Sequence, residues 1–199
     1  MAGTRKFDEK DVLEHAINVF WGKGYIATTM LDLAKETGVQ RGSLYNAYNN
    51  KNTLFLKAFS HYTEQFLLMI RKDLEEEDAY LAFQQLLGNI VDRLTADKEH
   101  KGCFSTRTMM EAAQQCETVK ASLRHFLDQL EGIIEERLQQ AITKGQFNGN
   151  ARASARYLVT LTRGIAVVER IYNDKERIAE VYQTALEQMP FDTTIKPSE

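Results

Sequence analysis

Apolar residues recur at three- and four-residue steps along nearly the whole chain, which is the spacing of amphipathic helices. After Asp8 they occupy positions 12, 13, 16, 17, 20 and 21, and a longer series runs from 54 to 69. Alternating strand-like runs do not appear, and the first 189 residues contain no proline. Because proline interrupts helices, this pattern predicts an all-α protein of about nine helices.

Cap residues set the expected helix ends. Asp8, Asn50, Asn150 and Asp174 each stand before an apolar series as an N-cap would. Thr29 is followed by Asp32 at the spacing of a capping box. Gly24 and Gly38 terminate the first two helices. Beyond the short pair in 28–48, the expected helices are 8–23, 51–74, 79–95, 103–113, 116–144, 151–172 and 174–189, and the tail from Phe191 is expected to fray.

Residues 28–51 predict two short helices joined by a tight turn at Gly38. The second, about 40–48, has Leu44 and Ala47 for packing and leaves a polar, acid-free face. A helix-turn-helix presents its second helix to a DNA major groove in this way. Arginine, asparagine and glutamine read base edges, whereas hydroxyl groups and lysine hold phosphates. The candidate DNA-binding residues are Thr29, Gln40, Arg41, Gly42, Ser43, Tyr45, Asn46, Tyr48 and Lys51, with inward packing an equal alternative for Tyr48.

Charge is distributed unevenly along the chain. The net charge is −3, yet residues 1–60 carry eight Lys/Arg against six Asp/Glu. No acidic residue occurs between Glu36 and Glu64. A local basic face on an acidic protein suits a DNA-binding head with a separate body. The acidic run 75–78 marks the expected boundary. We therefore predict a DNA-binding domain at 1–60, whose last helix continues to about 74, and a second domain at 75–199.

Several other classes of protein lack support in the sequence. There is no apolar run long enough to cross a membrane, and the N-terminus has no apolar signal region. Cys103 and Cys116 form no disulfide framework. The four histidines lack the spacing of metal ligands, and no nucleophile elbow, Walker loop or dinucleotide motif occurs. The chain is expected to be a cytoplasmic protein, not an enzyme, with no cofactor and no metal.

The segment GYIATTMLDLAKETGVQRGSLYNAYNNKNTLF resembles the DNA-binding head of the TetR/AcrR family of bacterial transcription regulators. The resemblance covers residues 8–60 in register, and 61–199 match in helical pattern alone. Where the family often has an aromatic–His–Phe run, this chain has Asn46–Ala47–Tyr48, which implies an operator of its own. The family further implies a homodimer that binds a double-stranded, near-palindromic operator. It also implies repression in the absence of a small-molecule effector and release from the DNA when that effector binds.

The same resemblance places a dimer surface on the last two long helices and an effector pocket in the body. The candidate dimer residues are Leu158, Ile165, Val168, Val181 and Tyr182. The candidate ligand-binding residues are Cys103, Phe104, Arg107, Met110, Phe126 and Tyr157. In both cases the alternative is ordinary core packing, or for Arg107 an exposed or interface position.

Two alternatives to a ligand-responsive repressor remain open at this stage. A helix N-terminus lowers a thiol's pKa, so Cys103, at the start of its helix, could act as a sensor of electrophiles or oxidants. Its alternative is an inert cysteine, because free cysteine is often buried. The second alternative is a helical interaction protein that does not bind DNA.

Overall fold

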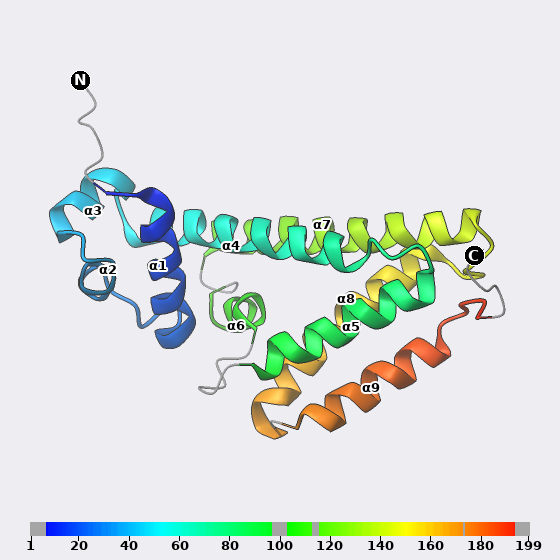
Figure 1. Ribbon diagram of the computed structural model, residues 1–199. Coiled ribbons are helices and arrows are strands. Elements are labelled where there is room, and N and C mark those ends of the chain that lie inside the picture. The colour runs from blue at the N-terminus through cyan, green and yellow to red at the C-terminus, as the bar shows by residue number, and fades with distance from the viewer. Residues whose placement is uncertain (1–6, 97–102, 113–115, 173, 194–199) are drawn as a thin grey trace. The chain divides into compact units, whose positions relative to one another are not determined.

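The protein is helical throughout the part of the chain that the computed structural model describes, residues 7–96, 103–112, 116–172 and 174–193 (Figure 1). The all-α fold predicted from the sequence is confirmed for this part. The helices are Glu9–Lys23 (α1), Met30–Thr37 (α2), Arg41–Tyr48 (α3), Lys51–Asp73 (α4), Ala79–Thr95 (α5), Phe104–Glu111 (α6), Glu117–Thr143 (α7), Ala151–Tyr172 (α8) and Lys175–Gln188 (α9).

Side-chain caps begin most of these helices where the sequence placed them. The Asp8 carboxylate accepts hydrogen bonds from the amides of Lys10 at 2.7 Å and Asp11 at 3.3 Å. Asn50 accepts one from the amide of Thr53 at 2.9 Å. Asn150 and Asp174 do the same for α8 and α9, and Asp78, a cap not predicted from the sequence, does so for α5. Because such caps satisfy amides that have no partner in the helix, they fix the register of each helix start.

The chain divides into two compact units. The first comprises residues 1–66 and 107–124, and the second comprises 67–106 and 125–199. Residues 107–124, which follow the acidic run and fall in the expected second domain, therefore pack with the first unit. Helix α6 is divided between the units, with Thr106 in the second and Arg107 in the first.

An aromatic cluster forms the core of the first unit. The Phe55 ring lies edge-on to Phe20, with centroids 4.9 Å apart, and to Tyr25 at 4.8 Å. Phe59 stacks on Phe55 at 5.9 Å. Helix α1 packs on α2, and α2 packs on α3. Of the short helices that carry the candidate DNA-binding residues, α2 thus rests on α1 and α3 rests on α2.

The second unit has its own core. Figure 1 shows α5 beside α9, and these two helices are in contact. Its fully buried side chains include Phe83, Phe104 and Phe126. Arg137 of α7 donates hydrogen bonds to the main-chain carbonyls of Leu74 at 3.2 Å and Glu76 at 2.8 Å. This guanidinium therefore satisfies carbonyls that follow the end of α4.

The segment after α9 does not begin to fray at Phe191, contrary to the expectation. Phe191 forms an isolated β-bridge with Phe147. Its ring lies 4.9 Å from that of Phe147 and 5.4 Å from that of Phe83, centroid to centroid. These ring contacts outweigh the tendency of a chain end to fray. The remainder of the expected tail, 194–199, lies outside the described residues.

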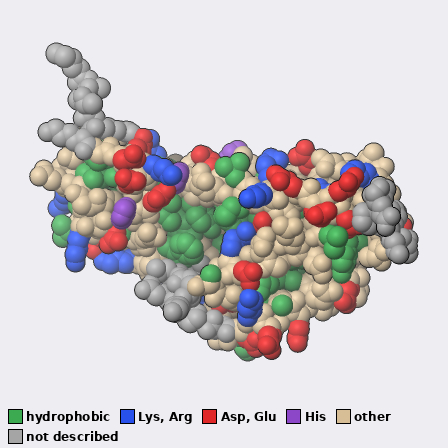
Figure 2. All heavy atoms as spheres, in the orientation of Figure 1, with side chains coloured by type: hydrophobic (Ala, Val, Ile, Leu, Met, Phe, Trp, Pro, Cys, Tyr) green, Lys and Arg blue, Asp and Glu red, His purple; other side chains and the backbone are tan. Residues whose placement is uncertain are grey.

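The surface is charged with both signs. On the face in Figure 2, Lys and Arg side chains lie interspersed with Asp and Glu. Among the described helices, none has the length and apolar character that a membrane crossing requires. The described residues also contain no cluster of histidine, cysteine and carboxylate side chains suited to a metal ion.

Candidate functional site

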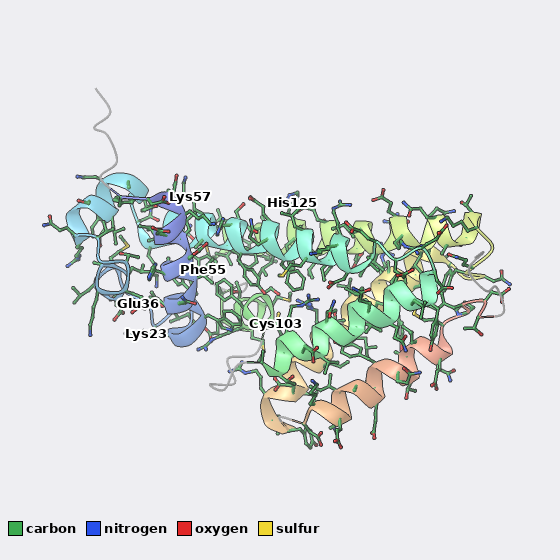
Figure 3. All side chains as sticks on the ribbon, in the orientation of Figure 1. Lys23, Glu36, Phe55, Lys57, Cys103 and His125 are labelled. Atoms are coloured by element: carbon green, nitrogen blue, oxygen red, sulfur yellow. The ribbon has the colours of Figure 1, made fainter. Side chains whose placement is uncertain are left out.

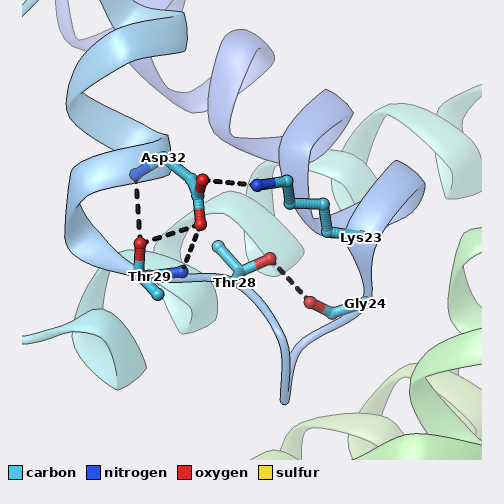
Figure 4. Close-up of polar contacts among 5 residues, drawn as sticks. All are labelled: Lys23, Gly24, Thr28, Thr29 and Asp32. Atoms are coloured by element: carbon cyan, nitrogen blue, oxygen red, sulfur yellow. Dashed lines mark hydrogen bonds and ion pairs between the residues drawn. The ribbon is translucent and has the colours of Figure 1, made fainter.

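Helix α2 begins at the capping box that the sequence predicted (Figure 4). The Thr29 hydroxyl accepts a hydrogen bond from the Asp32 amide at 3.2 Å, and the Thr29 amide donates to the Asp32 carboxylate at 3.0 Å. Lys23, the last residue of α1, forms an ion pair with the same carboxylate. Hydrogen bonds from Lys23 and Thr29 lower the pKa of Asp32 to about 2. The start of α2 is therefore tied to the end of α1.

Glycine makes the turn between α2 and α3. Gly38 has φ of +67°, the left-handed conformation that side chains other than glycine adopt at a cost. Gln40 then occupies the N-cap position of α3 without a side-chain capping bond. Its side chain is exposed. The turn thus leads directly into the helix whose first turn holds Arg41, Gly42 and Ser43.

Helix α3 buries one side and exposes the other. Leu44 and Tyr48, four residues apart, are 0% and 1% exposed and face the core. The exposed positions carry the polar residues of the helix and no carboxylate. They are Gln40, Arg41, Gly42, Ser43, Tyr45 and Asn46. Since an α-helix fits the major groove of DNA, this face has both the size and the chemistry of a reading surface.

Arg41 and Tyr45 form a pair on this face. The Arg41 guanidinium lies over the Tyr45 ring, 5.4 Å from its centroid, and its Nη2 is 3.5 Å from the Tyr45 hydroxyl. Tyr45 is 40% exposed. At an exposed site such a cation–aromatic contact contributes about 0.5–1 kcal/mol. The pair therefore presents a guanidinium and a hydroxyl side by side to the solvent.

Two of the candidate DNA-binding residues occupy other environments. Tyr48 is buried and packs near Phe7, with ring centroids 6.3 Å apart, so the alternative of inward packing is the correct one. Lys51 donates hydrogen bonds to the carbonyls of Tyr25 at 2.8 Å and Ile26 at 3.2 Å. Burial lowers the pKa of the Lys51 ammonium. Lys51 thus joins α4 to the turn after α1, a long-range contact that its sequence neighbours do not reveal.

The six candidate ligand-binding residues are divided between the two units. Arg107 and Met110 belong to the first unit, and the others belong to the second. Phe104 and Phe126 are 1% exposed core residues, whereas Met110 and Tyr157 are 59% and 46% exposed. Arg107 binds main-chain carbonyls of α1. Amphipathic spacing shows which residues share one face of a helix. It does not show which of those residues other helices bury and which remain exposed to solvent.

Cys103, labelled in Figure 3, lies just before α6 in the second unit, and polar side chains surround it. The Cys103 Sγ lies 3.1 Å from the Ser105 hydroxyl and 3.4 Å from Nη1 of Arg163. Arg163 also donates to the Ser105 hydroxyl at 2.8 Å. Burial raises the pKa of the thiol, but Arg163, Ser105 and Thr106 more than offset it, and the pKa falls to about 7. A substantial fraction of thiolate is therefore present near neutral pH.

The expected dimer residues also fall into two groups. Leu158, Ile165 and Tyr182 are 1%, 8% and 3% exposed and belong to the core of the second unit. Val168 and Val181 are 42% and 39% exposed. Other apolar side chains of α8 are also exposed, namely Val167, Ile171 and Tyr172. A groove of about 270 Å³ between α8 and α9 has Val168, Tyr172 and Val181 in its walls.

The sequence matches two family models. Residues 12–58 match the family described as bacterial regulatory proteins, tetR family. Residues 82–185 match the family described as tetracyclin repressor-like, C-terminal domain. The two matches lie in the order that such a regulator requires and together span most of the chain.

Individual relatives agree with these matches along nearly the full length. The HTH-type transcriptional regulator YezE of Bacillus subtilis is 27% identical over 190 residues, 94% of this chain and 98% of that protein. The HTH-type transcriptional repressor ComR of Escherichia coli is 23% identical and covers 92% of this chain and 90% of its own length. A cysteine mutant of the TetR family regulator CifR, in complex with a 26-base-pair double-stranded operator DNA, superposes with a TM-score of 0.84 at 26% identity. That similarity covers 94% of this chain and 99% of the other.

Proposed function

Because the chain belongs to the TetR family of bacterial regulatory proteins, we propose that it represses transcription by binding a near-palindromic operator as a homodimer. A small-molecule effector would release it from the DNA. It would act in the cytoplasm and carry out no catalysis. ComR, a relative over most of the chain, is a repressor, and the CifR mutant was seen on operator DNA. These relatives support both repression and binding to double-stranded DNA.

The observation that carries the proposal is the exposed, acid-free face of α3. Gln40, Arg41 and Asn46 bear the side chains that hydrogen-bond to guanine and adenine edges, and all three are exposed. Ser43, Tyr45 and Thr29 supply exposed hydroxyls suited to phosphate oxygens. Gly42 leaves room for close approach of the main chain. Tyr48 is left out because it is buried, and Lys51 acts mainly by supporting the turn after α1.

Replacing Arg41 with alanine is expected to weaken operator binding by roughly 10- to 100-fold, because one bidentate base contact is worth about 1–3 kcal/mol. Binding to DNA from upstream of the chain's own gene, followed over a range of salt concentrations, provides the measurement. Lys72→Ala removes one positive charge from an exposed position outside the first unit and should leave affinity nearly unchanged. Equal effects of the two variants would contradict direct readout by Arg41.

The cluster at Cys103 favours a second candidate function, a regulator that responds to electrophiles or oxidants through this thiol. The guanidinium of Arg163 stabilises the thiolate, and the thiolate is the reactive form of cysteine. The Tyr182 hydroxyl is buried without a hydrogen-bond partner among the described residues, and burial raises its pKa. Tyr182 interacts electrostatically with both Arg163 and Cys103, and Arg163 lies 3.4 Å from the sulfur. A hydroxyl donor and a cation would thus be available to the oxygen of an electrophile that reaches the thiol.

The pH dependence of alkylation tests this candidate. In a Cys116→Ser protein, the rate at which N-ethylmaleimide labels Cys103 should rise through about pH 7 and level off above it, because the thiolate fraction follows the pKa. Replacing Arg163 with methionine should move the midpoint to higher pH. A midpoint near 8.5, the ordinary value for cysteine, would contradict an activated thiol. Undiminished release of operator DNA by the electrophile in a Cys103→Ser protein would exclude the sensor role.

A further inference from the structure

A side chain of α6 donates hydrogen bonds to the last carbonyls of α1. Nη1 of Arg107 donates hydrogen bonds to the carbonyls of Trp21 at 2.7 Å and Gly22 at 3.1 Å. The last carbonyls of a helix have no partner within it, and a cation there also interacts favourably with the helix dipole. Nε of Arg107 binds the Glu111 carboxylate at 2.7 Å. This ion pair fixes the orientation of the guanidinium, which is half-buried.

Glu111 occupies the space over the residue that ends α1. Gly24 has φ of +84°. A Cβ added to Gly24 would lie 2.0 Å from Oε2 of Glu111, far inside van der Waals contact. The backbone conformation favours glycine here, and a larger residue would also have to displace the Glu111 carboxylate. Arg107 and Glu111 together hold the end of α1 through its carbonyls and through the turn that follows.

The start of α7 makes a second contact within the same unit, with the first turn of α4. Nδ2 of Asn52, in the first turn of α4, donates to the Thr118 hydroxyl at 3.2 Å. The Tyr25 hydroxyl donates to Oδ1 of Asn52 at 3.3 Å. Tyr25 follows Gly24 directly, and its carbonyl accepts the hydrogen bond from Lys51. The contacts from α6 and α7 thus converge on the turn after α1 and on the start of α4.

We infer that Arg107, Glu111 and Thr118, named here the α1–α4 clamp, are positioning residues for DNA recognition although none lies in the helix-turn-helix. This inference rests on the proposed function. Helix α1 supports α2, which supports α3, and Lys23 at the end of α1 pairs with Asp32 at the start of α2. Fixing the end of α1 therefore fixes the helices that carry the reading face.

A thermal-stability cycle tests the contact without any reference to DNA. Gly24→Ala should lower Tm by several degrees, because it introduces both backbone strain and a clash with Glu111. Adding Glu111→Ala removes the clash. The decrease in Tm of the double variant should therefore be smaller than the sum of the decreases in the two single variants. Additive losses would show that Glu111 does not lie over Gly24 and would overturn the clamp.

Operator affinity tests the positioning role. Arg107→Met removes the hydrogen bonds to the two carbonyls of α1 and to Glu111. It should weaken operator binding about tenfold, with the salt dependence unchanged. Arg107→Lys, which keeps a cation near the carbonyls, should restore part of the affinity. Arg124→Met, at an exposed position of the same unit, serves as the control for lost charge. A salt slope lower by about 1 would instead identify Arg107 as a phosphate contact, and an unchanged affinity would refute the positioning role. If the unaltered protein binds no operator, the proposed function fails while the thermal cycle still decides on the clamp.

Discussion

Replacing Phe55 with alanine is expected to destabilise the DNA-binding unit by about 3–5 kcal/mol, the usual cost of removing a buried phenylalanine side chain. Phe55 is 0% exposed and lies in α4 between the rings of Phe20, Tyr25 and Phe59. The substitution removes edge-to-face contacts with two of these rings, which add to the loss of buried area. It also leaves a cavity beneath the turn after α1.

Equilibrium unfolding in denaturant and operator binding should be measured on the same Phe55→Ala protein. Because the affected core supports α1 and the first turns of α4, DNA binding should be lost under conditions in which much of the helical signal of the second unit persists. Phe55→Leu retains most of the apolar volume and should cost markedly less. A Phe55→Ala protein that binds operator with unchanged affinity and unfolds at the same denaturant concentration would contradict this account of the core.

The helices and their ends could be predicted from the sequence because their determinants are local. A cap such as Asp8 or Thr29 acts on amides within three residues, and Gly38 sets the conformation of its own turn. The reading face of α3 is local as well. Leu44 signals which side is buried, and the exposed polar positions follow from the helical period. Local signals of this kind are sufficient to predict the fold class and most of the candidate interface.

The residues that escaped prediction act through contacts between distant parts of the chain. Arg107 binds carbonyls 85 and 86 positions away, and no periodicity connects these sites. Tyr48 has a hydroxyl suited to phosphate, but it lies four residues from Leu44 on the buried side. Helical spacing showed that α8 and α9 are amphipathic. It could not separate the core residue Tyr182 from its exposed neighbour Val181, because both lie close to the border of the apolar stripe.

The exposed apolar residues of α8 provide a test of the proposed dimer interface. Val168→Glu combined with Ile171→Glu is expected to convert the proposed dimer into monomers and to weaken operator binding on the order of 100-fold or more. The two side chains are 42% and 79% exposed within one chain, so the substitutions should not disturb its core. Buried at a dimer interface, the new carboxylates would face one another or apolar side chains and lose their hydration. A monomer engages one half-site at a time and loses the gain in avidity that joining two binding units confers.

Light scattering after size-exclusion chromatography measures the oligomeric state, and operator titration measures the affinity. Leu68→Glu is the matched control, because Leu68 is an equally apolar residue, 60% exposed on α4, outside the proposed interface. The control should remain dimeric and bind DNA normally. If Leu68→Glu produced monomers while the double variant stayed dimeric, the interface would lie elsewhere. If the double variant became monomeric yet kept its full affinity, DNA recognition by this protein would not require two heads.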